Sequence, residues 1–370
     1  MSKTNAPFRF DYVGSFLRPD YLKKARADLE KGSITKAELT AVEDKAITEL
    51  VKKQKELGYK VITDGEFRRA TWHLDFMWGF NGVAHKKTEK GVAFHGEPAL
   101  IDDTWLTGKI SVDSHPFVEH YKFVKALEDE NTVAKQTIPA PAQFFQQMII
   151  PANIDATRKF YATDDELIAD IANGYKKVIN DLYNAGCRNI QLDDCTWGVL
   201  VAEGSVIRYG KENNLADIKE KLLKVNNLAI GGKPDDLTIT THICRGNYHS
   251  AYFSSGAYDS VAEPLFGREN VDAYYLEFDD ERSGGFEPLK YVSGNKKVVL
   301  GLITTKSPKL EDKQTVIERI HEASKYIPLD RLYLSPQCGF ASCEIGNKLT
   351  EEQQWAKLAL VKEIAEEVWG

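Results

Sequence analysis

A histidine and a cysteine stand two positions apart, just after an apolar run that is typical of a β-strand. The run covers residues 237–240, and His242 and Cys244 follow it. Glu277 and Cys338 come at the ends of two further runs of this kind. Imidazole, thiolate and carboxylate all bind Zn²⁺ in tetrahedral shells, and two thiolates favour zinc over Mg²⁺ or Ca²⁺. These residue types therefore predict one zinc ion held by His242, Cys244, Glu277 and Cys338.

Two ordinary interpretations compete with a metal site. A single histidine in a turn commonly makes a structural hydrogen bond, and buried cysteines commonly serve as small hydrophobic residues. The four candidate ligands are spread over about a hundred residues, so they do not form a compact zinc-finger pattern. The other three cysteines, Cys187, Cys195 and Cys343, are interpreted as such core residues.

The composition argues against a nucleic-acid-binding or membrane protein. The net charge is -7 over 370 residues and the sequence pI is about 5.7, whereas surfaces that bind nucleic acids or anionic lipids are basic. No apolar run reaches transmembrane length, and the N-terminus lacks the apolar segment of a secretory signal. Five cysteines at irregular spacing suit a reducing compartment. We expect a cytoplasmic protein with small-molecule partners; the sequence leaves the oligomeric state open.

The candidate ligands need a scaffold, and the pattern of the chain indicates which one. Eight β-type runs cover residues 12–16, 60–67, 132–141, 189–197, 237–246, 273–280, 297–305 and 331–340. Amphipathic helical patterns separate many of them, most clearly at 34–58, 164–186 and 307–327. This alternation predicts a single (β/α)8 barrel over residues 1–370. No GxGxxG or P-loop motif follows the first run, which weakens the competing doubly wound sheet.

Residues 68–131 are too long for an ordinary connection and predict an inserted loop or hairpin over one mouth of the barrel. In such barrels the active site lies at the carboxyl ends of the strands. The reactive side chains fall largely at these ends: Asp64, Glu66, Asp193, Asp194, His242, Cys244, Glu277 and Cys338. Such an accumulation favours one common site at the mouth.

Six motifs occur in a fixed order: VGSF at 13–16, DGEF at 64–67, IQLDD at 190–194, H-x-C at 242–244, LEFD at 276–279 and SPQCGF at 335–340. Together they resemble the catalytic barrel of cobalamin-independent methionine synthase, over residues 12–345. The resemblance implies a zinc-dependent methyltransferase that moves a methyl group, from 5-methyltetrahydrofolate or its polyglutamate, to the thiol of homocysteine, giving methionine. A zinc-bound thiol ionises readily, and its thiolate is the nucleophile.

The resemblance also implies roles for the residues around the metal. Ser15 and its backbone would hold the carboxylate of homocysteine, and Glu66 and Asp193 would hold its ammonium group, which makes Asp193 a catalytic as well as a binding residue. The alternative is that Glu66 and Asp193 are solvated strand-end carboxylates, or ion-pair partners of Arg68, Arg69 or Arg245.

On the methyl-donor side the chain departs from the family pattern. Lys306 stands where the family has a proton-donating histidine. It is the predicted general acid, provided that burial or nearby positive charge lowers its pKa; the alternative is an ordinary solvent-exposed lysine. The acidic residue expected after IQ-D-E is missing near Gly198. Phe144 or Phe145 would replace the family's tryptophan after the third strand. The remaining candidates for donor and substrate binding are Trp72, His73, Trp78 and Trp197; the alternative is that they pack in the core or in a lid.

Two other functions remain open. One is a zinc-dependent thiol alkyltransferase of the epoxyalkane–coenzyme M transferase type, although the carboxylates of Glu66 and Asp193 would repel a sulfonate. The other is a non-catalytic zinc-binding barrel, in which the acidic strand ends would share no ligand.

Overall fold

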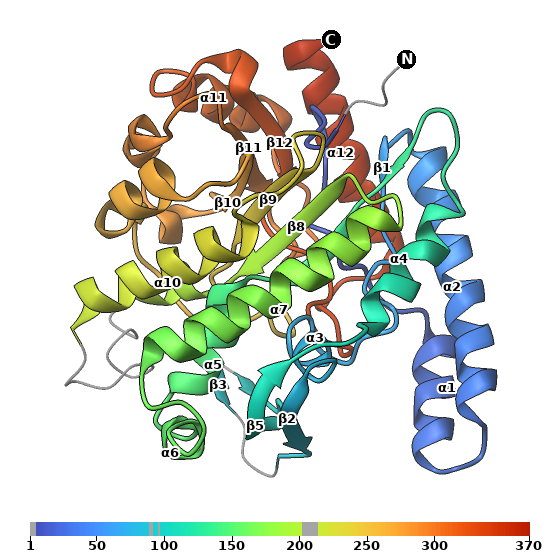
Figure 1. Cartoon of the computed structure of the whole chain (residues 1–370). Coiled ribbons are helices and arrows are strands. Elements are labelled where there is room, and N and C mark those ends of the chain that lie inside the picture. The colour runs from blue at the N-terminus through green and yellow to red at the C-terminus, as the bar shows by residue number, and fades with distance from the viewer. Residues whose placement is uncertain (1–4, 89–91, 95–96, 202–213) are drawn as a thin grey trace.

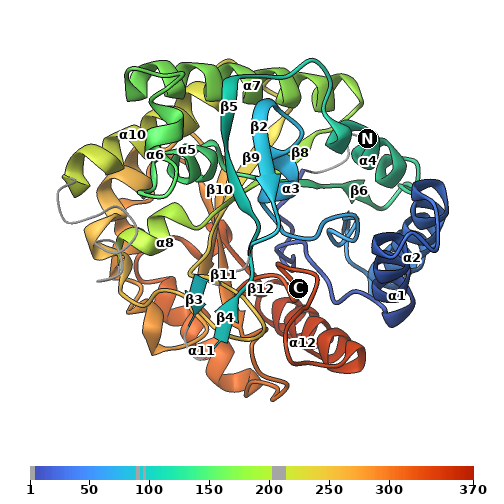
Figure 2. The same ribbon diagram turned by 90° about the horizontal axis from the view of Figure 1, so that it is seen from below.

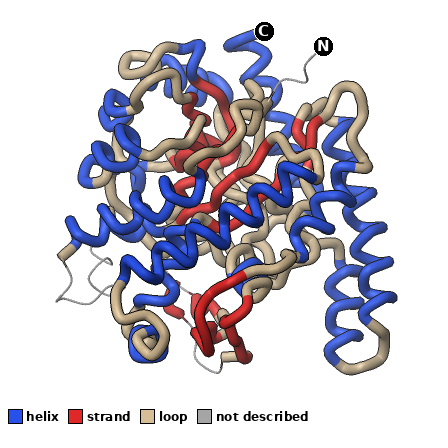
Figure 3. Tube along the Cα trace, viewed as in Figure 1, coloured by secondary structure: helices blue, strands red, loops and turns tan. Residues whose placement is uncertain are grey.

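Parallel strands form the centre of the molecule, and helices lie around them (Figures 1 and 3). The computed structural model describes residues 5–88, 92–94, 97–201 and 214–370. Six strands form one parallel sheet in the order β12, β11, β10, β9, β8, β7. Their bounds are Gln136–Pro139 (β7), Asn189–Asp194 (β8), Thr238–Ile243 (β9), Ala273–Glu277 (β10), Lys297–Ile303 (β11) and Leu332–Pro336 (β12). Each strand therefore lies beside its neighbour in the chain, as in successive β/α units.

Two short strands and the N-terminal segment complete the wall of the barrel. β1 (Val61–Ile62) pairs in parallel with β6 (Val133–Ala134), which comes just before β7. Residues 9–16 lie between β12 and the end of β1. The amide of Asp11 donates to Leu334 O at 3.0 Å, and the amide of Phe16 donates to Gly65 O at 3.1 Å. The (β/α)8 fold expected from the sequence is confirmed.

The first expected run, residues 12–16, follows the wall without forming a regular strand. Gly14 has a φ of 143°, and a Cβ atom there would lie 2.7 Å from Thr137 Cγ2. Its carbonyl oxygen accepts from Thr63 Oγ1 at 3.0 Å. The hydrogen bond from the Thr63 side chain thus takes the place of a backbone hydrogen bond between strands. Only glycine allows residue 14 to lie so close to Thr137.

Long helices pack around the strands because each buries one apolar stripe. They are α1 (Asp20–Glu30), α2 (Lys36–Glu56), α7 (Asp164–Asn184), α10 (Leu215–Ile230), α11 (Lys313–Ala323) and α12 (Glu351–Trp369). Capping boxes fix the first turns of α2, α7 and α12, which start after Thr35, Thr163 and Thr350. Three further helices are α5 (Pro141–Ile149), α6 (Ile154–Thr157) and α8 (Thr196–Leu200), and 3₁₀ or π turns cover Tyr258–Ser260, Glu263–Gly267, Glu281–Ser283, Glu287–Tyr291 and Leu329–Arg331. None of the helices in the described part of the chain has the length and apolar character needed to cross a bilayer.

The connection between β1 and β6 forms the expected insertion. It holds α3 (Leu74–Met77), α4 (Pro116–Lys125) and two antiparallel pairs, β2 (Asn81–Lys86) with β5 (Asp103–Ser111) and β3 (Val92–Phe94) with β4 (Glu97–Ala99). Figure 1 shows β2, β3 and β5 at one end of the barrel, and in Figure 2 the two hairpins lie across that end. The predicted inserted hairpin is confirmed, and it consists of two hairpins.

Alternate residues of the strands face either the helices or the interior of the barrel. Leu276 and its neighbours in the main core pack against the helices. A small second cluster, Val13, Tyr275, Val299 and Tyr333, occupies the interior. Because residues two apart share a face, Glu277 follows Tyr275 on the inner face at the end of β10. The strand register then places the polar strand ends around one mouth.

Candidate metal centre and acceptor pocket

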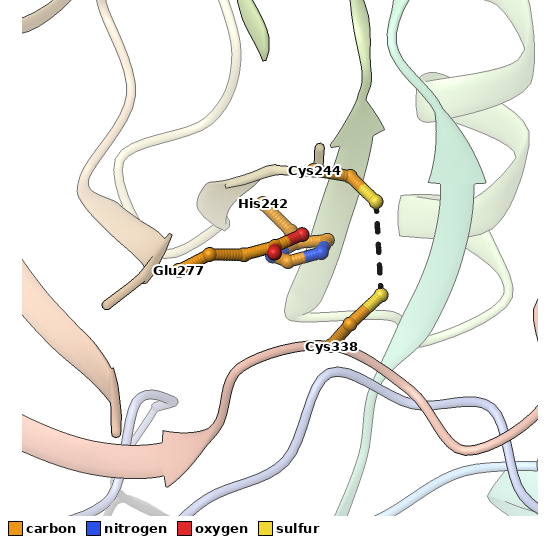
Figure 4. A group of neighbouring side chains, drawn as sticks. All are labelled: His242, Cys244, Glu277 and Cys338. Atoms are coloured by element: carbon orange, nitrogen blue, oxygen red, sulfur yellow. Dashed lines mark hydrogen bonds between the residues drawn. The ribbon is translucent and has the colours of Figure 1, made fainter. Parts of the chain in front are cut away.

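The four predicted metal ligands converge at the mouth of the barrel. His242 lies on β9 and Cys244 just after it, Glu277 ends β10, and Cys338 lies in the loop after β12. One ligand atom from each lies within 4.8 Å of those of the other three, and Figure 4 shows the side chains turned toward one another. All four residues are buried.

Two features of the backbone bring Cys244 to the same place as His242. The amide of Cys244 donates to Asp194 O at 2.9 Å, which ties the chain to β8 beyond the end of β9. A Cβ atom at Gly198 would lie 2.1 Å from the carbonyl oxygen of Cys244. The start of α8 can therefore pack against this turn only because residue 198 has no side chain.

The surroundings of His242 fix its tautomer. Nδ1 lies 3.2 Å from Tyr275 O, and because a carbonyl only accepts, Nδ1 carries the proton. Nε2 is buried and has no hydrogen-bond partner among the described residues. A histidine held by a backbone carbonyl through one ring nitrogen, with the other nitrogen turned toward the ligand cluster, is the usual arrangement of a metal-bound histidine.

The two thiols have the spacing that a tetrahedral zinc requires. Sγ of Cys244 and Sγ of Cys338 are 3.7 Å apart (Figure 4), and two sulfurs each about 2.3 Å from a tetrahedral zinc lie about 3.8 Å apart. Hydrogen bonding with Cys195 and burial raise the pKa of Cys244, and hydrogen bonding with Cys244 and burial raise that of Cys338. A divalent cation would offset this and stabilise both thiolates, so the donor set fits Zn²⁺.

Glu277 accepts a hydrogen bond through one of its two carboxylate oxygens. Its Oε1 accepts from the amide of Arg245 at 2.8 Å. Its Oε2 is buried without a hydrogen bond in the described part of the chain, and Arg282 Nη2 lies 3.7 Å away. One carboxylate oxygen thus remains for a metal ion, with a cationic side chain behind it.

Ser15, Glu66 and Asp193 line the same cavity as three of the metal ligands, His242, Cys244 and Cys338. The cavity has a volume of about 380 Å³. Asp193 is the register partner of His242 across β8 and β9, and a Cβ atom at Gly339 would lie 1.9 Å from Ser15 Oγ. These three residues and the four-ligand cluster are called the acceptor half. Within the cluster Glu277 is fully buried and does not line the cavity.

Glu66 is buried in a strained turn. Its φ is 63°, which is uncommon for a residue with a side chain and is typical of functional sites. Oε1 accepts from Thr137 Oγ1 at 3.0 Å and lies 3.3 Å from Arg69 Nη1, while Oε2 has no hydrogen bond among the described residues. Burial raises the pKa of Glu66 to about 7, although Arg69 opposes the shift.

Asp193 has a similar environment. Burial raises its pKa to about 7, against a hydrogen bond that Gln191 Nε2 donates to Oδ1 at 2.8 Å. The alternative of solvated carboxylates is therefore wrong, because both groups are at most 5% exposed. Of the suggested ion pairs, only Glu66–Arg69 forms among the described residues. Arg68 pairs with Glu43 and Asp44.

The other half of the cavity, called the insert half, lies under the inserted hairpins. Its residues include Trp72, Phe94, Asp103, Gln143 and Gln147. Of the sequence candidates for donor binding, Trp72 and His73 line the cavity, whereas Trp78 and Trp197 do not, and Trp197 is fully buried.

The predicted aromatic platform on α5 is wrong. Phe144 and Phe145 are completely buried and do not line the cavity. Gln143, Gln146 and Gln147 line it, because residues at i, i+3 and i+4 share one face of a helix. The spacing of the three glutamines in PAQFFQQ is the sequence feature that could have predicted this face.

Lys306 is not brought to the cavity. Its Nζ is buried without a hydrogen-bond partner among the described residues, and it is absent from the cavity lining. Two cysteines interpreted as core residues do line the cavity: Cys195, which is hydrogen-bonded to Cys244, and Cys343. Cys187 is a core residue as expected, and burial raises its pKa to about 12.

Known proteins share this sequence and fold. The model of the cobalamin-independent synthase catalytic domain matches residues 10–367. Uncharacterized protein YxjG of Bacillus subtilis is 44% identical, over 100% of this chain and 97% of its own length. A methionine synthase of Sulfolobus acidocaldarius is 22% identical over 88% of this chain and 84% of its own.

The crystal structure of a putative vitamin-B12 independent methionine synthase from Listeria monocytogenes superimposes with a TM-score of 0.78. It is 39% identical to this chain, and the match covers 99% of both chains. The family model spans nearly all of the chain, including every element that carries a ligand. The chain therefore belongs to the cobalamin-independent methionine synthase family, as a catalytic domain.

Proposed function

We propose that the protein transfers a methyl group to the sulfur of homocysteine, giving methionine, with 5-methyltetrahydrofolate or its polyglutamate as donor. The observation that carries this proposal is that one cavity is lined by three residues of a zinc-type ligand cluster and by two buried carboxyl groups. The first suits a thiol and the second suits an ammonium group, and homocysteine has both.

Catalytic domains of this family are zinc dependent and use methyltetrahydrofolate, so the zinc cofactor expected from the sequence is confirmed. We assign the ion to His242, Cys244, Glu277 and Cys338. When bound, Zn²⁺ lowers the pKa of a coordinated thiol, which is then a thiolate at neutral pH. Glu277 would hold the ion through Oε2, and Arg282 Nη2, 3.7 Å from this oxygen, would stabilise the carboxylate if the acceptor sulfur took its place.

The protein residues position the acceptor. Glu66 offers Oε2, which has no hydrogen bond in the described structure, and Asp193 lines the same space. Burial raises the pKa of both carboxyl groups, so an incoming ammonium group draws the pair into its ionised form. Ser15 lines the cavity beside the Cys338 loop and supports the acceptor carboxylate.

Reaction then forms the S–CH₃ bond and breaks the N–CH₃ bond of the donor, while a proton goes to the donor nitrogen. The attacking sulfur and the methyl carbon must be in line, and holding them so supplies much of the rate. The insert half of the cavity, with Trp72 and Gln147, is where the donor binds in this proposal.

The test is a donor screen with zinc-loaded protein and homocysteine. Mono- and polyglutamyl 5-methyltetrahydrofolate, methylcobalamin and S-methylmethionine are compared, and methionine is measured by mass spectrometry. We expect methionine with a folate donor. Zinc-loaded protein that makes methionine with none of the four, and that binds coenzyme M instead of homocysteine, would overturn the proposal.

A further inference from the structure

A lysine lies inside the barrel, below the acceptor half of the cavity. Lys135 falls between β6 and β7, and its side chain is 1% exposed. Its Nζ donates to Asp11 Oδ1 at 3.1 Å, to Tyr12 O at 2.5 Å and to Gln191 Oε1 at 3.0 Å. These three acceptors use all three of its N–H groups. Asp11 alone would neutralise the ammonium charge of Lys135, so charge compensation does not account for the hydrogen bond to Gln191.

That bond decides which way the amide of Gln191 faces. An ammonium group can only donate, so it binds the carbonyl oxygen of the amide. The NH₂ group is then turned the other way, where it donates to Asp193 Oδ1 at 2.8 Å and to Val13 O at 2.7 Å. The flipped amide would set NH₂ against the ammonium of Lys135 and C=O against a carboxyl and a carbonyl oxygen. Lys135 therefore locks Gln191 in one orientation.

The locked amide fixes one edge of Asp193. Oδ1 is held by Gln191, while no hydrogen bond within the described residues engages Oδ2. Gln191 and Asp193 are two apart on β8 and share its inner face, so the contact does not depend on a loop. The carboxyl group of Asp193 is in this way presented to the cavity in a set plane, with one oxygen free for a ligand.

We propose that Lys135 is a positioning residue for the acceptor's amino group, which acts through Gln191 on Asp193. The inference rests on the proposed function, in which Asp193 binds the ammonium group of homocysteine. It predicts that Lys135 contributes to recognition of the amino group and leaves the metal and the thiol unaffected.

The experiment compares two thiols by calorimetry on zinc-loaded protein. Homocysteine carries the amino group, and 4-mercaptobutanoate is the same molecule without it. In Lys135→Met combined with Asp11→Asn, which leaves no unpaired buried charge, we expect homocysteine to bind about tenfold more weakly. The affinity for 4-mercaptobutanoate and the zinc content should stay within about twofold of the wild type.

The matched control is Lys357→Met. Lys357 is a second lysine with a fully buried side chain, which pairs with Glu311 at 3.0 Å on the outside of the barrel. We expect this variant to bind both thiols as the wild type does. Equal weakening of both thiols in the Lys135 variant would show a general structural role, and unchanged homocysteine binding would show no role; either result overturns the inference.

A double-mutant cycle tests the route through Gln191. Gln191→Met should cause a similar loss of homocysteine affinity, and adding it to the Lys135 variant should cost less than about twofold more, because both changes break one chain of hydrogen bonds. Additive losses would overturn the inference. A wild type that binds both thiols equally would instead refute the proposed function and the inference with it, so the two failures are distinct.

Discussion

The acceptor half and the insert half of the cavity are built in different ways. His242, Asp193 and Glu277 stand on strands, where the register sets their height and the two-residue period sets their direction. Phe94, Asp103 and Gln147 come from inserted hairpins and from a helix, whose places depend on tertiary packing. The comparison teaches that the strands of the barrel and the turns after them hold the candidate metal ligands and the two buried carboxyl groups, whereas hairpins and a helix attached to the barrel line the rest of the cavity.

The largest expected effect comes from removing a metal ligand. Cys338→Ser should reduce zinc affinity at least about 100-fold and abolish methyl transfer, because one of two thiolates is lost from a buried shell. Zinc content by elemental analysis and methionine formation are the measurements.

The control for this change is Cys187→Ala. It removes another buried thiol, whose Sγ donates to Asn189 O away from the cavity. We expect it to keep one zinc per chain. Full zinc content in Cys338→Ser would show that Cys338 is not a ligand. The acceptor half would then lose the metal centre that distinguishes it from the insert half.

A methyl group at Gly198 should disturb the acceptor half without touching a ligand side chain. Its Cβ would meet the carbonyl oxygen of Cys244 at 2.1 Å, so either α8 or the Cys244 turn must move. We expect Gly198→Ala to lower the free energy of unfolding by about 2–4 kcal/mol and to weaken zinc binding. Chemical denaturation and zinc titration measure the two effects.

Gly267→Ala is the matched control, since the nearest atom to its added Cβ is Tyr291 O at 3.9 Å. It should change the stability by less than about 1 kcal/mol. If Gly198→Ala behaved in the same way, the close approach of α8 to Cys244 would not be what sets the cysteine in place.

Glu66→Gln should separate acceptor binding from metal binding. We expect homocysteine to bind about tenfold more weakly while the zinc content is unchanged, because a neutral amide replaces a carboxylate opposite the ammonium group. In the wild type the affinity should fall as the pH drops below about 7, since the pKa of Glu66 is about 7 and the carboxylate is the binding form. A flat pH profile between 5.5 and 8 would contradict this assignment.

The same pKa predicts a change in stability of opposite sign. Burial raises the pKa of Glu66 in the folded state to about 7 from 4.5, so the folded protein binds this proton more tightly than the unfolded chain. Its contribution to stability is present at low pH and is lost as the pH rises to about 7. Glu66→Gln should therefore raise the free energy of unfolding at pH 8 by about 3 kcal/mol and leave it unchanged near pH 4. Denaturant titrations at the two pH values measure this difference.

The division into two halves also explains how much could be predicted from the sequence. The barrel followed from the alternation of β-type runs and helices, and the four ligands followed from their positions at strand ends. The register of β8 against β9, which makes Asp193 the partner of His242, turned those positions into one site.

Other features depended on contacts that no motif encodes. Cys195 follows the Asp193–Asp194 pair directly, yet its place beside Cys244 arises from the packing of α8 on the turn after β9. Phe144 and Phe145 were better indicators of the hydrophobic core than of a binding surface, and the three glutamines beside them face the cavity. Side chains on helices and inserted hairpins are thus assigned to a site by packing, which sequence spacing alone constrains weakly.

The smallest expected effect concerns the insert half and the residue that protonates the methyl donor. Lys306 occupies the sequence position of a general acid, but its Nζ is buried outside the cavity without a hydrogen bond among the described residues. We expect Lys306→Met to change kcat by less than about threefold, because a residue that does not reach the donor cannot protonate it. Steady-state rates from pH 6 to pH 9 provide the measurement. A fall in kcat of about 100-fold or more, with an altered basic limb of the pH profile, would mean that the loop after β11 moves during turnover and carries Lys306 into the insert half.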